Sequence, residues 1–266
     1  MKYRVHPIHI GNFTVAYHGD DVKFPKVVNI PSFIFLLFDE NGEALLVDTG
    51  FDIDHIPAPD SYGERIDGLE ISDLIKKFGV DPLKIKKIIQ THLHWDHTAG
   101  LKYFPNAEIY LQVGEIKGLL DLQEFEDVAF NTSNWLDRTD SFILIHGDHK
   151  ILPGIEVIHT GIHTPGHQSV KVQGEDKTIL LLGDAPFTYD WLWTMVPHKY
   201  WASYKNGDGK KFFWTEDILP VIEKWYNKNK NESQKPLKDY PAKELYKLAD
   251  ISIFSHDPKL INKDII

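Results

Sequence analysis

The sequence predicts an α/β fold in which two β-sheets pack face to face and helices cover their outer faces. One observation is a repeated plan, because two apolar hairpins each end in an aspartate, at residues 33–48 and 169–184. Another is helical periodicity in segments that lie between the apolar strands. A third is size, since 266 residues of which 42% are hydrophobic can bury the core of one large domain.

Each predicted element rests on a local pattern. Short runs rich in β-branched and aromatic residues, bounded by turn residues, predict strands at 33–38, 44–47, 85–90, 169–172, 178–182 and 251–255. Helices are expected over residues 70–78, 113–122 and 215–229. In the first of these helices Ile71, Leu74, Ile75 and Phe78 recur at helical spacing, and Gly79 follows as a stop signal.

The chain is expected to form a single domain, residues 1–266, because it contains no long polar linker. Residues 187–245 are expected to be an insertion that is dense in aromatic side chains. Two interpretations of these aromatics stay open. In the first, they fill the core or form a contact between subunits, and a subunit contact would make the protein a homodimer. In the second, they form an apolar wall beside the active site.

Composition excludes several classes of function. A net charge of −10 and a pI near 5.7 argue against binding to nucleic acid, which needs a basic surface. The absence of cysteine excludes disulfides, thiolate nucleophiles and cysteine metal ligands. The N-terminus lacks the apolar core of a secretory signal, and the longest apolar stretch is too short to span a bilayer. A cytoplasmic protein without membrane contact is therefore expected.

The segment from Thr91 to His97 contains three imidazoles and a carboxylate within six positions, which is the pattern HxHxDH. It follows the predicted strand 85–90, so the cluster begins where that strand ends. In extended backbone His92 and His94 point to the same side, and neutral imidazole and carboxylate are good ligands for divalent transition metals. The motif therefore predicts a metal site.

Further ligand-type residues occur at other strand boundaries. His167 ends the turn Thr164–Pro165–Gly166, and both Asp184 and His256 follow apolar strands. Seven groups are then available, enough for two metals that share one bridging carboxylate: His92, His94, Asp96, His97, His167, Asp184 and His256. His163 precedes the turn and is not predicted to belong to the site. Asp48 either accepts a hydrogen bond from a ligand imidazole or only ends its strand.

These motifs together resemble the metallo-β-lactamase-fold superfamily, and the residues His167–Gln168–Ser169 are most similar to its N-acyl homoserine lactonase branch. The similarity covers about residues 30–258. It implies a four-layer αββα sandwich with the metal site at one edge of the two sheets. It also implies that His92, His94 and His167 hold one metal, that Asp96, His97 and His256 hold the other, and that Asp184 bridges them.

The resemblance further implies a dinuclear hydrolase that opens lactone rings, either N-acyl homoserine lactones or related γ- and δ-lactones. A hydroxide between the two metals would attack the carbonyl, and Asp96 and Asp184 would be catalytic residues. Zinc is the expected metal, although the ligand set also accepts manganese, cobalt or iron. The partner is then a small-molecule lactone or ester.

One position departs from that branch, which usually has a tyrosine three residues after the bridging aspartate. Here the position is Phe187, which has no hydroxyl group. Tyr189 is the first candidate for the missing donor, ahead of Tyr200 and Tyr204. Either one of them does this work or the substrate differs.

Several alternatives share the fold. A thioesterase resembling glyoxalase II is the nearest, but its helical substrate domain would have to follow His256, which lies ten residues from the end. A β-lactamase or a phosphodiesterase is also compatible with the motifs. Diiron oxygen or nitric oxide reductases usually have Glu where this chain has His94. A non-enzymatic binding protein would be expected to have lost ligands, and none is missing.

Overall fold

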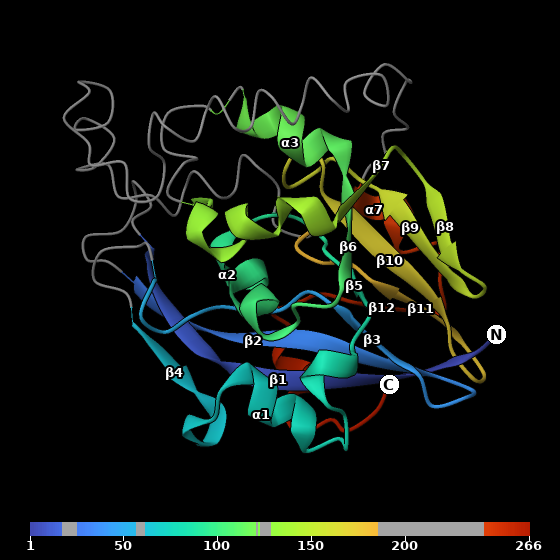
Figure 1. The fold of residues 1–266 in the computed structure, drawn as a ribbon, viewed down its shortest axis with the longest axis horizontal. Coiled ribbons are helices and arrows are strands. Elements are labelled where there is room, and N and C mark those ends of the chain that lie inside the picture. Colours follow the sequence, from blue (N-terminus) through green and yellow to red (C-terminus); the bar gives the residue numbers. More distant parts are fainter. Residues whose placement is uncertain (18–25, 57–61, 121, 123–128, 186–241) are drawn as a thin grey trace.

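Two mixed β-sheets face each other at the centre of the molecule, and helices lie outside them (Figure 1). The computed structural model describes residues 1–17, 26–56, 62–120, 122, 129–185 and 242–266. The predicted helix at 215–229 and most of the predicted insertion at 187–245 lie outside these residues. The single-domain organisation stays a prediction.

The larger sheet has seven strands in the order β4-β1-β2-β3-β5-β6-β7. In chain order the strands are β1 Tyr3–Tyr17, β2 Lys26–Asp39, β3 Ala44–Val47, β4 Gly63–Arg65, β5 Lys87–Ile89, β6 Glu108–Gln112 and β7 Phe142–Ile145. Neighbours from β4 to β3 are antiparallel, whereas β3, β5, β6 and β7 are parallel. Parallel strands need crossover connections, and the helices α1, α2 and α3 lie in these connections.

The smaller sheet has five strands in the order β12-β11-β10-β9-β8. They are β8 His149–Leu152, β9 Ile155–His159, β10 Gln168–Gln173, β11 Thr178–Leu181 and β12 Ile251–Ile253. β10 is antiparallel to both β9 and β11, and β11 is parallel to β12. The carboxyl ends of β9, β11 and β12 therefore lie at the same edge of the sheet.

The helices are shorter than the sequence predicts. They are α1 Ile71–Lys76, α2 Trp95–Thr98, α3 Val113–Leu119 and α7 Ala242–Leu245. Short 3-10 turns connect the main elements: Ile66–Gly68, Pro82–Lys84, Ala99–Tyr103, Thr132–Asn134, Leu136–Ser141 and Pro258–Leu260. α1 ends early because a turn leads into Gly79, whose φ of 75° lies in the left-handed region. None of the helices among the described residues is long and apolar enough to cross a membrane.

Alternation along β2 explains the layered core. Ile34 and Leu36 pack with the helices on the outer face of the larger sheet, whereas Phe33, Phe35 and Leu37 pack between the two sheets. Successive side chains on a strand point to opposite faces, so a strand covered on both faces is apolar throughout. A third cluster joins the smaller sheet to α7 through Leu180 and Leu245. The predicted αββα sandwich and both predicted hairpins are confirmed.

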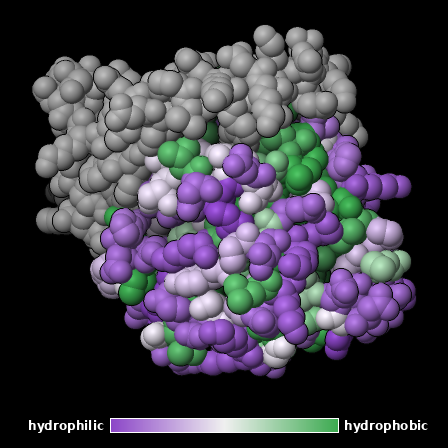
Figure 2. All heavy atoms as spheres, in the orientation of Figure 1, coloured by the Kyte–Doolittle hydropathy of each residue, from purple (hydrophilic) through white to green (hydrophobic). Residues whose placement is uncertain are grey.

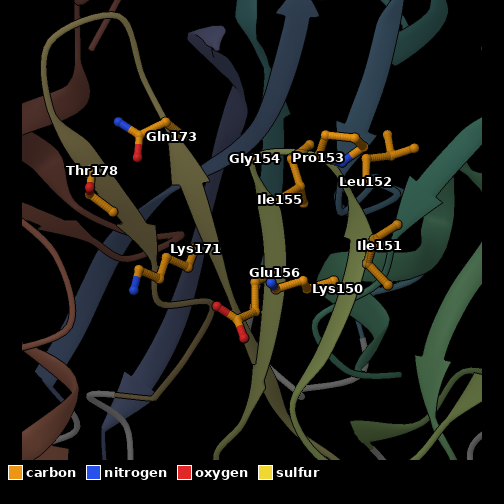
Figure 3. Close-up of a pocket in the computed structure, with 10 residues that line it drawn as sticks. All are labelled: Lys150, Ile151, Leu152, Pro153, Gly154, Ile155, Glu156, Lys171, Gln173 and Thr178. Carbon is orange, nitrogen blue, oxygen red and sulfur yellow. The ribbon is translucent and has the colours of Figure 1, made fainter. Parts of the chain in front are cut away.

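One face of the described part of the molecule is mainly polar. On the face in Figure 2, hydrophobic side chains of the described residues lie in small separate groups among hydrophilic ones. A cavity of about 460 Å³ lies on the smaller sheet, and Figure 3 shows the residues that line it. Ile155 and Thr178, the first residues of β9 and β11, line it together with Gly154. This cavity is therefore at the opposite end of the strands from the predicted metal ligands.

Candidate metal centre

The candidate metal centre lies beyond the carboxyl ends of four strands. The strands β5, β9, β11 and β12 are each followed, within three or four residues, by a buried histidine or aspartate, in chain order His92, His163, Asp184 and His256. The backbone N–H of Gln168 donates to the carbonyl of Thr91 at 2.9 Å, which joins the two sheets beside the site. Four separate segments thus converge at one edge of the sandwich.

Two groups of ligand-type side chains occupy this edge. The first consists of His92, His94 and His163; the second consists of Asp96, His97, Asp184 and His256. Within each group the potential ligand atoms lie within 4.8 Å of one another, and every residue is buried. We call these the first group and the second group.

Asp184 contacts both groups. Its Oδ2 atom lies 3.4 Å from Nε2 of His97 in the second group and 3.6 Å from Nε2 of His163 in the first group. Its Oδ1 atom lies 3.3 Å from Nε2 of His256. The carboxylate therefore stands between the two sets of imidazoles, as a bridging ligand must.

Hydrogen bonds from outside the groups orient two of the imidazoles. His97 Nδ1 lies 2.8 Å from Asp48 Oδ2, and His256 Nδ1 lies 2.9 Å from the carbonyl oxygen of Pro31. A carbonyl oxygen only accepts, so His256 carries its proton on Nδ1 and directs Nε2 toward the second group. Such contacts fix both the tautomer and the direction of a metal-binding ring.

Hydrogen bonds hold Asp48 in the position from which it orients the imidazole of His97. Its carboxylate accepts hydrogen bonds from the backbone N–H of Thr91 at 2.7 Å, from the Thr91 hydroxyl at 2.8 Å and from Gln90 Nε2 at 3.0 Å. Asp48 also adopts a φ of 60°, which is uncommon for a residue with a side chain. Of the two interpretations of Asp48, the structure favours the one in which it contacts an imidazole of the site, that of His97.

The electrostatic environment lowers the pKa of some histidines of the site and raises that of others. Burial, together with the neighbouring imidazoles, holds the pKa of His92 and of His94 well below the usual value. Burial would also lower the pKa of His256, but the carboxylates of Asp184 and Asp96 raise it to about 10. The pKa of His97 is raised by the same kind of contact, with Asp184 foremost among the carboxylates that outweigh burial.

The chemistry of these residues fits a bound cation. Among the described residues, His92 Nε2 is buried without a hydrogen-bond partner, and His97 Nε2 and Asp184 Oδ1 are buried with only ion-pair contacts inside the site. Leaving buried polar atoms unpaired is costly, and imidazole nitrogens and carboxylate oxygens are suitable donors for divalent transition metals. An ion held by the first group would satisfy His92 Nε2, and an ion held by the second group would satisfy His97 Nε2 and Asp184 Oδ1.

The structure places His163, not His167, in the first group. Both ring nitrogens of His167 are engaged elsewhere, since Nε2 accepts from the backbone N–H of Asp184 at 3.0 Å and Nδ1 lies 2.6 Å from the Thr160 hydroxyl. His163 Nε2 instead lies 3.0 Å from Nδ1 of His94. The structure therefore groups His163, instead of the predicted His167, with His92 and His94, and His163 is the residue carried into the proposal below.

A signal in the sequence could have identified His163. The ligand-type residues follow the carboxyl ends of strands, and His163 follows β9, which ends at His159. His167 instead immediately precedes β10, which starts at Gln168. The prediction placed the Thr164–Gly166 turn before the strand that follows it and did not include the strand that ends before the turn.

The structure brings the other six predicted ligands into the two groups. Tyr189, Tyr200 and Tyr204, the candidate donors, lie outside the described residues, as does Phe187. Two aromatic residues that the sequence reasoning missed border the site. The ring of Phe13 lies 5.5 Å from His256 and that of Phe130 lies 4.8 Å from His94.

The family follows from comparison with known proteins. The family model described as the metallo-beta-lactamase superfamily matches residues 29–219. The chain belongs to the metallo-beta-lactamase superfamily. It is a metal-dependent hydrolase of that superfamily, and the two-sheet architecture of the fold agrees with this assignment.

Several relatives within the superfamily are similar to this chain. An N-acyl homoserine lactonase from Bacillus thuringiensis is 30% identical over 175 residues, which are 61% of this chain and 67% of the relative. The lactonase AttM from Rhizobium radiobacter is 32% identical over 129 residues, 44% of this chain and 48% of the relative.

Solved structures agree on the fold. One is an N-acyl homoserine lactone hydrolase with the product N-hexanoyl-L-homoserine bound at its catalytic metal centre. It superposes with a TM-score of 0.63 at 22% identity, and the alignment covers 100% of both chains.

Proposed function

We propose that this protein is a dinuclear metal hydrolase that opens lactone rings, with N-acyl homoserine lactones as the first substrate class to test. The observation that carries the proposal is Asp184, which lies within 3.6 Å of an imidazole from each group. A carboxylate shared by two ligand sets is what a pair of metals in one active site requires. The lactonases among the relatives favour a lactone as the substrate.

The residues divide into two metal positions. His92, His94 and His163 would hold one ion; Asp96, His97 and His256 would hold the other, and Asp184 would contact both. Two bound divalent ions would supply a nucleophilic water at neutral pH and polarise the substrate carbonyl. The buried surroundings of the imidazoles exclude bulk water from these ligands.

Asp96 is the proposed proton carrier of the site. Its Oδ2 atom lies 3.3 Å from Nε2 of His256 and 3.7 Å from Nε2 of His97. Although it is buried, burial is outweighed by the charge of His97 and by contacts with His256, which lower its pKa and keep it ionised at neutral pH. An ionised carboxylate can accept a proton from the attacking water and return it to the departing ring oxygen.

Aromatic side chains supply an apolar border for the acyl part of the substrate. Phe13 packs against Trp95 at 5.0 Å between ring centroids, and its ring also meets His256 edge-on. Phe130 lies against His94 on the side of the first group. Large aromatic surfaces beside a polar reaction centre favour a substrate with an apolar chain.

A substrate panel tests the proposal. Metal-reconstituted protein is assayed with N-acyl homoserine lactones, simple γ- and δ-lactones, S-acyl thioesters and nitrocefin. Lactone opening that disappears in His94→Ala and persists in His55→Ala is the expected result, because the ring of His55 is 53% exposed and outside both groups. Turnover of thioesters alone would contradict the proposed reaction.

A further inference from the structure

Glu115 is a buried carboxylate that the proposed reaction does not use. It lies in the first turn of α3 and is 1% exposed. The residue is outside both metal-ligand groups. A buried carboxylate is costly unless hydrogen bonds compensate for the water it loses, so its partners indicate what it does.

Its partners come from both loops that carry the first group. Glu115 Oε2 accepts from the backbone N–H of Leu93 at 3.1 Å. Glu115 Oε1 accepts from the backbone N–H of Gly166 at 3.0 Å and from the hydroxyl of Thr164. Leu93 stands between the ligands His92 and His94, and Thr164 directly follows His163. One carboxylate therefore holds the two loops at a fixed separation.

The backbone around Glu115 packs closely against the Pro165–Gly166 turn. A Cβ atom on Gly166 would lie 2.0 Å from the backbone nitrogen of Glu115, and one on Gly114 would lie 2.9 Å from the carbonyl oxygen of Pro165. The absence of side chains at these two glycines lets the start of α3 lie directly against the Pro165–Gly166 turn. The carboxylate thus acts from a rigid support.

We propose that Glu115 is a positioning residue for the first group, holding the loop of His92 and His94 against the loop of His163 and thereby setting the metal affinity of that position. The inference rests on the proposed two-metal site. It goes beyond that proposal because it assigns a task to a residue that contacts neither metal position. Outer partners of metal ligands typically change metal affinity about 10- to 100-fold.

The test substitutes Glu115→Gln, which keeps the shape of the side chain. A carboxamide has only one acceptor oxygen, so it cannot accept from Leu93 on one side and from Thr164 and Gly166 on the other. Co²⁺ affinity is measured from visible absorption in two backgrounds. His256→Ala preserves the first group, and His94→Ala preserves the second.

We expect Glu115→Gln to weaken Co²⁺ binding about 10- to 100-fold in the His256→Ala background. In the His94→Ala background the affinity should change by no more than about twofold, because Glu115 bonds to the segments that carry His92, His94 and His163. Glu108→Gln is the matched control, because Glu108 is an exposed carboxylate on β6 that bonds to Lys87 and Tyr110 instead of the loops. It should change neither affinity.

A second pair of variants covers the case in which Glu115→Gln does not fold. Thr164→Val removes the hydroxyl donor and should weaken the first position, whereas Thr164→Ser keeps the donor and should preserve it. Equal effects on both positions, or none on the first, would overturn the inference. Lactone turnover is assayed separately on the unsubstituted protein, so a failure of the substrate proposal leaves the Co²⁺ result interpretable. Absence of Co²⁺ binding by unsubstituted protein would overturn both.

Discussion

At the scale of single residues, Asp48 contacts His97 of the second group without belonging to that group. One of its oxygens lies 2.8 Å from His97 Nδ1, while the carboxylate is itself held by Thr91 and Gln90. Its backbone has a φ of 60°, in the left-handed region. Asp48, which directly follows β3, therefore supplies a hydrogen-bond acceptor for Nδ1 of His97.

The first prediction concerns Asp48→Asn. Asparagine tolerates the left-handed backbone, so the fold should persist. The carboxamide presents an N–H₂ group in place of one acceptor oxygen, which leaves His97 without its charged partner. We expect about a 10- to 100-fold loss of metal affinity at the second position, measured by competition with a chromophoric chelator. Unchanged affinity in the folded variant would show that Asp48 has no such role.

The second prediction separates His163 from His167. His163→Ala should lose one of two tightly bound ions, because it removes a member of the first group. His167→Ala should keep both ions and lose thermal stability, since it leaves the buried N–H of Asp184 without the imidazole that accepts from it. The number of ions bound per chain in each variant is measured by mass spectrometry of gel-filtered protein. The reverse pattern would restore His167 as a ligand.

At the scale of secondary-structure elements, the parts that could be predicted are those with strict local patterns. The hairpin of β2 and β3 has alternating faces and a turn between its strands, and it forms as expected. The 3-10 turns at Thr132–Asn134 and Leu136–Ser141 have no periodic signal and were not predicted. Their structure depends on contacts with distant backbone.

Arg138 provides such a contact and a third prediction. Its guanidinium donates to the carbonyl oxygens of Leu101 at 2.6 Å and Phe104 at 3.1 Å, beyond the end of α2. A lysine cannot reproduce this fork. We expect Arg138→Lys to lower the free energy of unfolding by about 1 to 3 kcal/mol, measured by urea denaturation, with little effect from Lys117→Arg on α3. An unchanged free energy would contradict this.

At the scale of the whole molecule, the site is built from both sheets at once. The larger sheet supplies His92 through His97 after β5, and the smaller sheet supplies His163, Asp184 and His256. The sequence could predict six of the seven members because each belongs to a recognisable motif. It could not reveal which histidine of the 163–167 segment faces the others, because this depends on how β9 and β10 are placed.

The balance of charge across the site gives a fourth prediction, for metal uptake. In the metal-free protein the neighbouring carboxylates outweigh burial and raise the pKa of His256 to about 10, so this imidazole is protonated at pH 7.5. Metals bind the neutral ring, so uptake must release a proton, and affinity should rise as the pH increases toward 10. Calorimetry in buffers of different ionisation enthalpy measures the release. Proton-independent binding would contradict the assignment of His256.

The most direct test of the two-group site is a crystal structure of zinc-reconstituted protein with anomalous scattering recorded at the zinc edge. We predict two ions, one bound by His92, His94 and His163 and the other by Asp96, His97 and His256, at about 2.0 to 2.2 Å from their ligand atoms. Asp184 should contact both ions. A single ion, or ions bound away from these side chains, would contradict the account.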